Sequence, residues 1–412
     1  MKLVSTLALG AALALSSAVA PALAQKKAAA APAAPNYKLS KEFRAALAPA
    51  QPAIKAGNTA AAVAALAAAE ALVKTPDEKY IAAAVRLELA SAAKDPAMQG
   101  RAIEGMIASG SAPTADLPKL HYYAGSLAYQ RNDFVNANRF LAQAHQLGYA
   151  GSDLYLLLAE SNFKSNQVPA GLAFVDKAVA AKRAANEKAP EDWYRRAASV
   201  AYKAKLMPES SRWTREQVRA YPSADNWRSA LVIYRDSGQR DGQLNLDLFR
   251  LMRATKSLDG ERDYYEYAAL ATERGLPGEA KAVIEEGLAS GKVPSSSRAI
   301  TEMRTMASGK ISADRASLAT SERQAAGAAT GKIAANTGDA YLGYGDDAKA
   351  IALYRAALTK GGVDTDAVNT RLGIALARSG DKAGARAAFA AVKGTRQEIA
   401  QFWMLYIDQA TT

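Results

Sequence analysis

The sequence lacks the residues and motifs that most catalytic and metal sites need. It has 412 residues and no cysteine, which excludes disulfides, thiol nucleophiles and thiolate metal sites. The two histidines, His121 and His145, belong to no HExxH pattern, and no GxSxG segment is present. The segment GAATGK, residues 327–332, is one residue short of a phosphate-binding loop and is followed by Ile333 instead of serine or threonine. We therefore expect no enzymatic activity, no metal and no cofactor.

Long hydrophobic runs are also missing after the N-terminal segment, so no transmembrane segment is expected in the mature chain. The first 24 residues have Lys2, an apolar stretch and the small residues Ala22 and Ala24, which is typical of a secretory signal peptide cleaved after Ala24. A membrane anchor is the alternative, but Ser16 and Ser17 interrupt the apolar run. Without cysteine there is no lipobox. The sequence predicts a periplasmic or secreted protein.

Aromatic residues make up only 7% of the chain, although hydrophobic residues make up 50%. Much of that apolar content is alanine, which favours closely packed helices, and the alternating Val/Ile/Thr pattern of strands is almost absent. We expect an all-α fold. The Ala/Pro/Lys-rich segment QKKAAAAPAAPN, residues 25–36, has the composition of a linker, and the folded part is expected to begin at residue 40.

What the sequence does contain is a repeat. In residues 331–362 a small residue, Gly338, is followed by the turn residue Gly345 and by the large residue Tyr354. The same offsets return 35 residues later at Gly373, Gly380 and Phe389. Weaker copies occur upstream, for example at Gly125, Asn132 and Leu141 and at Ala159, Asn166 and Val175. Each copy predicts two helices joined by a tight turn.

These offsets resemble the tetratricopeptide repeat (TPR) family. The resemblance implies a right-handed α-solenoid of about nine to ten helix hairpins, ending in a capping helix, because a single hairpin cannot bury its apolar face alone. The expected organisation is a signal peptide at 1–24, a linker at 25–39, a solenoid block at 40–291, a segment at 292–330, two well-matched repeats at 331–394 and the capping helix at 395–412.

The segment at 292–330 has two interpretations, a degenerate repeat or a helical spacer. Ile300, Met303 and Met306 have helical spacing, and we expect a turn at Gly309 followed by a polar second helix. In the capping helix, residues such as Phe402 and Trp403 form an apolar face that is expected to cover the end of the last repeat.

In TPR proteins the first helix of each pair lines a concave groove, and the resemblance implies which residues would lie there. The implied groove is aromatic and basic in its middle part: Tyr122, Tyr129, Phe163, Lys164, Arg195, Tyr202, Lys203, Arg228, Arg235 and Tyr265. Packing between adjacent first helices is the alternative explanation for several of the rings, and a solvated face is the alternative for the cations. The asparagines with which some TPR proteins bind a peptide carboxylate are absent, because Ser126, Glu160 and Ser199 occupy that slot.

The sequence thus predicts a non-catalytic periplasmic scaffold that binds other proteins, including acidic peptide segments. A binder of an anionic envelope polymer is the alternative, and an enzyme built on an α-solenoid ranks below both. The net charge of +12 also suggests nucleic acid, but predicted export and the scattered basic residues argue against that partner.

Overall fold

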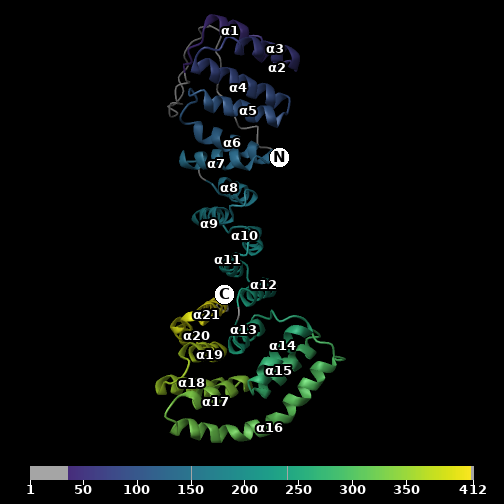
Figure 1. Cartoon of the computed structure of the whole chain (residues 1–412), viewed down its shortest axis with the longest axis vertical. Coiled ribbons are helices and arrows are strands. Elements are labelled where there is room, and N and C mark those ends of the chain that lie inside the picture. Colours follow the sequence, from purple (N-terminus) through teal and green to yellow (C-terminus); the bar gives the residue numbers. More distant parts are fainter. Residues whose placement is uncertain (1–35, 150, 239, 410–412) are drawn as a thin grey trace, which may run out of the picture. The chain divides into compact units, whose positions relative to one another are not determined.

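The computed structural model describes residues 36–149, 151–238 and 240–409 (Figure 1). All regular elements within these ranges are helices, which confirms the predicted all-α fold. The chain divides into two units, Met1–Ala189 and Pro190–Thr412, called unit 1 and unit 2 below. The predicted signal peptide and most of the predicted linker lie outside the described residues.

Unit 1 contains nine helices in its described part: α1 (Lys41–Leu47), α2 (Ala50–Lys55), α3 (Thr59–Glu70), α4 (Pro76–Ala92), α5 (Pro96–Ala108), α6 (Leu117–Gln130), α7 (Phe134–Gln146), α8 (Ser152–Lys164) and α9 (Val168–Ala184). Consecutive helices pair as antiparallel hairpins, α4 with α5, α6 with α7 and α8 with α9. This sequential pairing is the solenoid that the repeat predicts.

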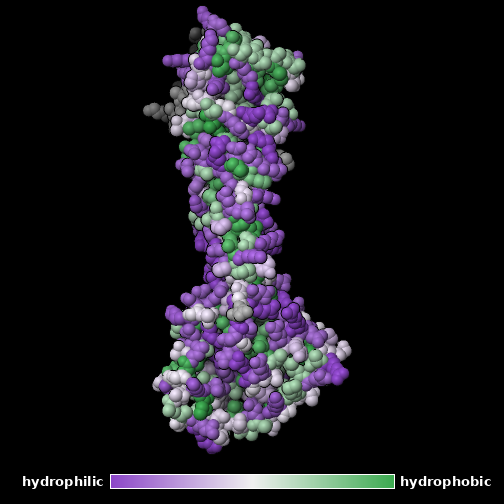
Figure 2. Space-filling view, viewed as in Figure 1, coloured by the Kyte–Doolittle hydropathy of each residue, from purple (hydrophilic) through white to green (hydrophobic). Residues whose placement is uncertain are grey.

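Unit 2 begins with α10 (Glu191–Lys203), α11 (Met207–Ala220), α12 (Ala224–Asp236), α13 (Gly242–Ala254), α14 (Gly260–Glu273) and α15 (Pro277–Ala289). It continues with α16 (Arg298–Gly327), α17 (Lys332–Tyr344), α18 (Asp347–Lys360), α19 (Thr365–Arg378), α20 (Lys382–Ala391), the 3-10 turn η1 (Gly394–Arg396) and α21 (Gln397–Gln409). The pairs α10/α11, α14/α15, α17/α18 and α19/α20 are again hairpins. Figure 2 shows that the visible surface over α13–α21 is mostly hydrophilic.

Helices end at the predicted turn glycines, and the next helix begins directly after each turn, as expected. Gly345 and Gly380 have φ values of 80° and 87°, in the left-handed region that glycine adopts without steric cost. Directly after them, the carboxylates of Asp346 and Asp381 accept hydrogen bonds from the backbone N–H three residues later and cap α18 and α20. The carboxylates in these turns therefore have a capping role.

The small-to-large offsets reflect direct contact between the two helices of a pair. A Cβ atom placed on Gly338 would come within 2.9 Å of the Tyr354 ring, and one placed on Gly373 within 2.5 Å of the Phe389 ring. Only glycine leaves room for these rings, so Gly338 and Gly373 set how closely the helices of the α17/α18 and α19/α20 hairpins approach.

Unit 2 closes on itself, which the repeat did not predict. Helix α21 packs on α20, where Phe389 and Trp403 stack at 5.9 Å, and thus covers the last hairpin as expected. It also contacts α11 and α13. The side chain of Gln409 accepts a hydrogen bond from Trp227 Nε1 (3.2 Å) and donates one to the Val218 carbonyl (2.8 Å). The C-terminal helices thereby return to α11–α13 (Figure 1).

Two sequence-based expectations are wrong. The turn at Gly309 does not exist, because α16 runs without a break from Arg298 to Gly327. Residues 37–39, predicted to belong to the linker, pack on α4: Tyr37 stacks on Tyr80 at 5.1 Å, and Lys38 N donates to Asp77 Oδ2 at 2.8 Å. The block boundaries at 291, 330 and 394 stay predictions.

Candidate functional site

The predicted groove rings of unit 1 mostly serve packing. Tyr122 is buried and stacks on Tyr149, with ring centroids 4.4 Å apart. Burial, with Asp153 nearby, raises the pKa of the Tyr122 phenol well above its usual value. Tyr129 packs edge-on against Phe134 at 5.5 Å. Both rings are therefore engaged in packing, Tyr122 with the segment that follows α7 and Tyr129 with the first residue of α7.

The remaining groove candidates of unit 1 lie at the end of α8. The Phe163 ring lies against Gly171 of α9, where an added Cβ would come 2.4 Å from its edge. Lys164 is exposed. Phe163 is therefore part of the α8/α9 contact, and Lys164 is a solvated cation.

The predicted arginines of unit 2 all have internal partners. Arg228 forms an ion pair with the buried carboxylate of Asp263 and donates to the Ser257 carbonyl at 3.0 Å. Arg235 lies 3.3 Å from Asp236 Oδ1 and 3.9 Å from Glu266 Oε2. These two arginines join neighbouring helices.

Arg195 pairs with Asp192 on the same helix, where both side chains are exposed. Ion pairs between two exposed side chains add little to the free energy of unfolding. Arg195 therefore remains accessible to a partner, whereas Arg228 and Arg235 have structural roles.

Tyr202, Lys203 and Tyr265 differ from the other candidates. Tyr202 and Tyr265 expose 48% and 42% of their surface, and Lys203 is exposed beside Tyr202. None of the three side chains makes a hydrogen bond or ion pair with a described residue. Tyr202 and Lys203 lie on α10, and Tyr265 lies on α14, two hairpins further along the chain. We refer to these three residues together as the exposed tyrosine surface.

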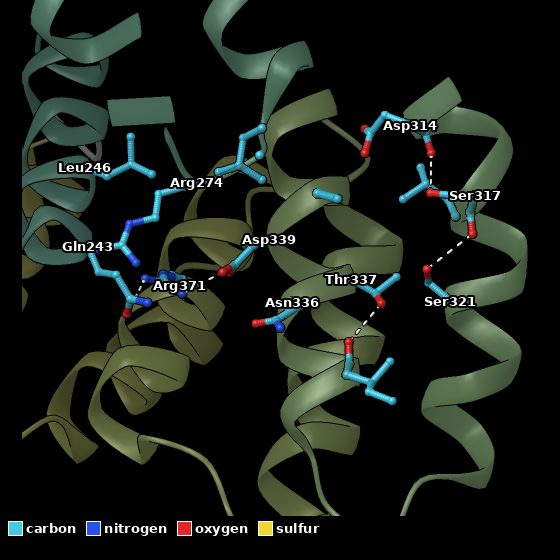
Figure 3. Close-up of a pocket in the computed structure, with 15 residues that line it drawn as sticks. Gln243, Leu246, Arg274, Asp314, Ser317, Ser321, Asn336, Thr337, Asp339 and Arg371 are labelled. Atoms are coloured by element: carbon cyan, nitrogen blue, oxygen red, sulfur yellow. Dashed lines mark hydrogen bonds and ion pairs between the residues drawn. The ribbon is translucent and has the colours of Figure 1, made fainter. Parts of the chain in front are cut away.

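A polar pocket of about 400 Å³ that is open to solvent lies in unit 2 (Figure 3). Its walls come from α13, the end of α14, α16, α17 and α19, and its polar residues are Gln243, Arg274, Asp314, Ser317, Ser321, Asn336, Thr337, Asp339 and Arg371. The predicted groove does not include any of these residues. The pocket depends on helices that are far apart in sequence, so no local pattern marks it.

Arg371 connects the pocket to a buried charge network. Its Nη1 donates to Asp339 Oδ2 at 2.6 Å, its Nη2 donates to Gln243 Oε1 at 3.2 Å, and its Nε lies 3.5 Å from Asp247 Oδ1. Asp247 also accepts hydrogen bonds from Arg250 (2.8 Å) and from Arg396 (2.6 Å).

The network extends to α15, where Arg250 makes two hydrogen bonds to Glu279, at 2.8 and 2.6 Å. Three arginines, at 250, 371 and 396, face the carboxylates of Asp247, Glu279 and Asp339, and Arg396 also lies 3.8 Å from the exposed carboxylate of Asp241. Burial alone would raise the pKa values of Asp247 and Glu279, but the arginines more than offset it and lower both. The sequence contains a sign of this buried charge network, because the charged residues Asp247 and Arg250 interrupt the apolar run LNLDLFRLM.

The described residues contain no group of three or more His, Cys, Asp or Glu side chains that could hold a metal ion. Nor is any described helix long and apolar enough to cross a bilayer.

No protein-family model matches the sequence, and no curated protein matches it. Among solved structures, Pseudomonas aeruginosa pilF is 15% identical, with 57% of this chain and 90% of that chain covered and a TM-score of 0.25. The P58(IPK) TPR domain is 12% identical, with 90% and 98% covered and a TM-score of 0.23. The maize pentatricopeptide repeat protein PPR10 is 16% identical, with 86% and 50% covered and a TM-score of 0.28. Similarities with TM-scores this low do not support a conclusion about function. The TPR-like fold is inferred from the sequential packing of the helix hairpins.

Proposed function

We propose that this protein is a non-catalytic, exported scaffold that binds another protein through the exposed tyrosine surface of unit 2. The observation that carries the proposal is the exposure of Tyr202 and Tyr265, two large rings that contribute little to the core of their own chain. Tyrosine is enriched at protein interfaces because its ring buries apolar area while its hydroxyl stays hydrogen-bonded.

The charge beside the rings indicates the kind of partner. Lys203 neighbours Tyr202, and Arg195 lies two helical turns earlier on α10 with only a surface ion pair. Exposed cations next to rings favour a partner that offers acidic side chains. An acidic peptide segment fits this combination.

Site-specific photo-crosslinking tests the proposal. A photoreactive phenylalanine analogue is placed at Tyr202 or at Tyr265, and Met306 of α16, which is 51% exposed, serves as the control position. We expect the same protein to be crosslinked from positions 202 and 265 but not from 306. The double substitution Tyr202→Ala with Tyr265→Ala should then weaken binding of that protein about tenfold or more.

Two results would contradict the proposal. One is equal crosslinking from all three positions. The other is adducts that contain only carbohydrate, which would favour the anionic polymer as the partner instead.

A further inference from the structure

The pocket in unit 2 has the size of a small-molecule site, with a lining that is more polar than is usual for such sites. Its volume of about 400 Å³ lies within the range of ligand pockets, and most of its exposed lining is polar. It is distinct from the exposed tyrosine surface, so a ligand in this pocket does not depend on the proposed function.

One wall of the pocket offers hydrogen-bond donors (Figure 3). The Gln243 carbonyl oxygen accepts from Arg371, which fixes the orientation of the amide and leaves its Nε2 group without a partner among the described residues. The side chain of Asn336, on α17, also makes no hydrogen bond with a described residue. These two amides provide neutral donors next to Arg371.

Arg274 adds a positive charge to this wall. A Cβ atom on Gly242 would lie 3.2 Å from Arg274 Nη2, so the guanidinium lies over the start of α13, beside Gln243. Arg371 is neutralised by Asp339 and Asp247, but Arg274 forms no ion pair with any described residue. The wall therefore has one uncompensated positive charge, which a single negative charge would balance.

The opposite wall, on α16, offers acceptors. Ser317 Oγ donates to the Asp314 carbonyl at 2.7 Å, and Ser321 Oγ donates to the Ser317 carbonyl at 3.2 Å. Because both hydroxyl hydrogens are used, the two hydroxyls face a ligand as acceptors. The Asp314 carboxylate, which already accepts from Tyr344, repels a second negative charge. A ligand on this side must donate hydrogen bonds.

We propose that this pocket binds a small hydroxylated carboxylate of the sugar-acid type. Its carboxylate would lie against Arg274, with Gln243 and Asn336 as additional donors, and its hydroxyl groups would donate to the α16 wall. A carboxylate suits the planar donor fork of arginine, and its single charge matches that of Arg274 better than the double charge of a phosphate monoester does.

Calorimetric titration of the full-length protein tests the assignment with three probes: glucuronate, glucose and glucose 6-phosphate. We expect glucuronate to bind at least tenfold more tightly than either other probe, because only it combines one negative charge with several hydroxyls. Arg274→Ala should weaken glucuronate binding about tenfold or more, and Asn336→Ala should weaken it less.

Arg262→Ala is the matched control, because Arg262 is an exposed arginine on the same helix that does not line the pocket. It should leave glucuronate affinity unchanged, as should Tyr202→Ala with Tyr265→Ala. Melting curves check that each variant is folded. No saturable glucuronate binding at millimolar concentration, tighter binding of glucose or glucose 6-phosphate, or equal losses in Arg274→Ala and Arg262→Ala would overturn the proposal.

Discussion

Asp247 shows how a single residue holds unit 2 together. It is fully buried on α13, yet it contacts arginines from α13, α19 and η1. Removing one member of a buried charge network leaves the others unpaired in a medium of low dielectric constant, and this cost exceeds what the pair contributes when it is intact. The closure of unit 2 therefore depends on this carboxylate.

Asp247→Asn should lower the free energy of unfolding at pH 7 by about 3–5 kcal/mol, because the arginines at 250, 371 and 396 would lose the buried carboxylate that they share. Chemical denaturation measures this change. The lowered pKa of Asp247 means that its contribution is present above the unfolded-state value of about 4 and is lost as the pH falls through the folded-state pKa. The variant should therefore lose less stability on acidification than the wild type does.

Glu302→Gln is the control for this prediction, because Glu302 forms an exposed pair with Arg298 and should change stability by less than about 1 kcal/mol. If Asp247→Asn is as mild as Glu302→Gln, or if its stability falls with acid as steeply as that of the wild type, the network does not stabilise unit 2.

At the scale of elements, α16 replaces the hairpin that the repeat spacing allowed in 292–330. Its 30 residues bury Ile300, Ala307, Leu318 and Ala325 and leave most other positions exposed or partly exposed. The helix packs along α15 and α17 and also contacts α14. These contacts hold one long helix through Gly309, although glycine is a poor helix former.

Gly309→Ala should raise the free energy of unfolding by about 0.5–1 kcal/mol, because the position is inside a helix and no atom lies within 4 Å of an added Cβ. Thermal or denaturant unfolding measures the gain. A glycine in a left-handed turn would give the opposite sign, so the measurement separates a continuous helix from a hairpin.

Gly373→Ala is the contrasting variant, since its Cβ would come 2.5 Å from the Phe389 ring. We expect it to destabilise the protein by about 1–3 kcal/mol through overpacking. A loss of stability in both variants would argue against the continuous α16.

At the scale of the whole molecule, we propose export on the evidence of the first 24 residues, which lie outside the described part of the chain. The argument is compositional: Lys2, the apolar stretch and the small residues Ala22 and Ala24 form the three parts of a signal peptide. The absence of cysteine is compatible with an oxidising compartment.

Intact-mass analysis of the periplasmic or secreted fraction should find a chain that begins at Gln25. Replacing the small residue at the cleavage site, as in Ala24→Phe, should leave an uncleaved chain, because signal peptidase requires a small side chain there. A full-length wild-type protein in the cytoplasm would refute export.

The sequence by itself determined the all-α fold and the hairpins with clear turn residues, such as α17/α18 and α19/α20. Turn residues such as Gly345 and Gly380, and the small-to-large contacts such as Gly373 with Phe389, act over distances of a few to about twenty residues. Patterns at that range are set by backbone conformation and by the fit of two adjacent helices, so they can be read along the chain.

Only the tertiary structure decided which predicted groove residues stay exposed, where unit 2 closes and where its pocket lies. Arg228 and Arg195 occupy equivalent positions in the groove that the sequence predicts, yet Arg228 pairs with Asp263, 35 residues away. Arg371 meets Gln243 across 128 residues, and Arg396 meets Asp247 across 149. Such contacts depend on the small rotation of each hairpin relative to the one before it, accumulated over many hairpins. No local sequence pattern encodes that accumulated rotation.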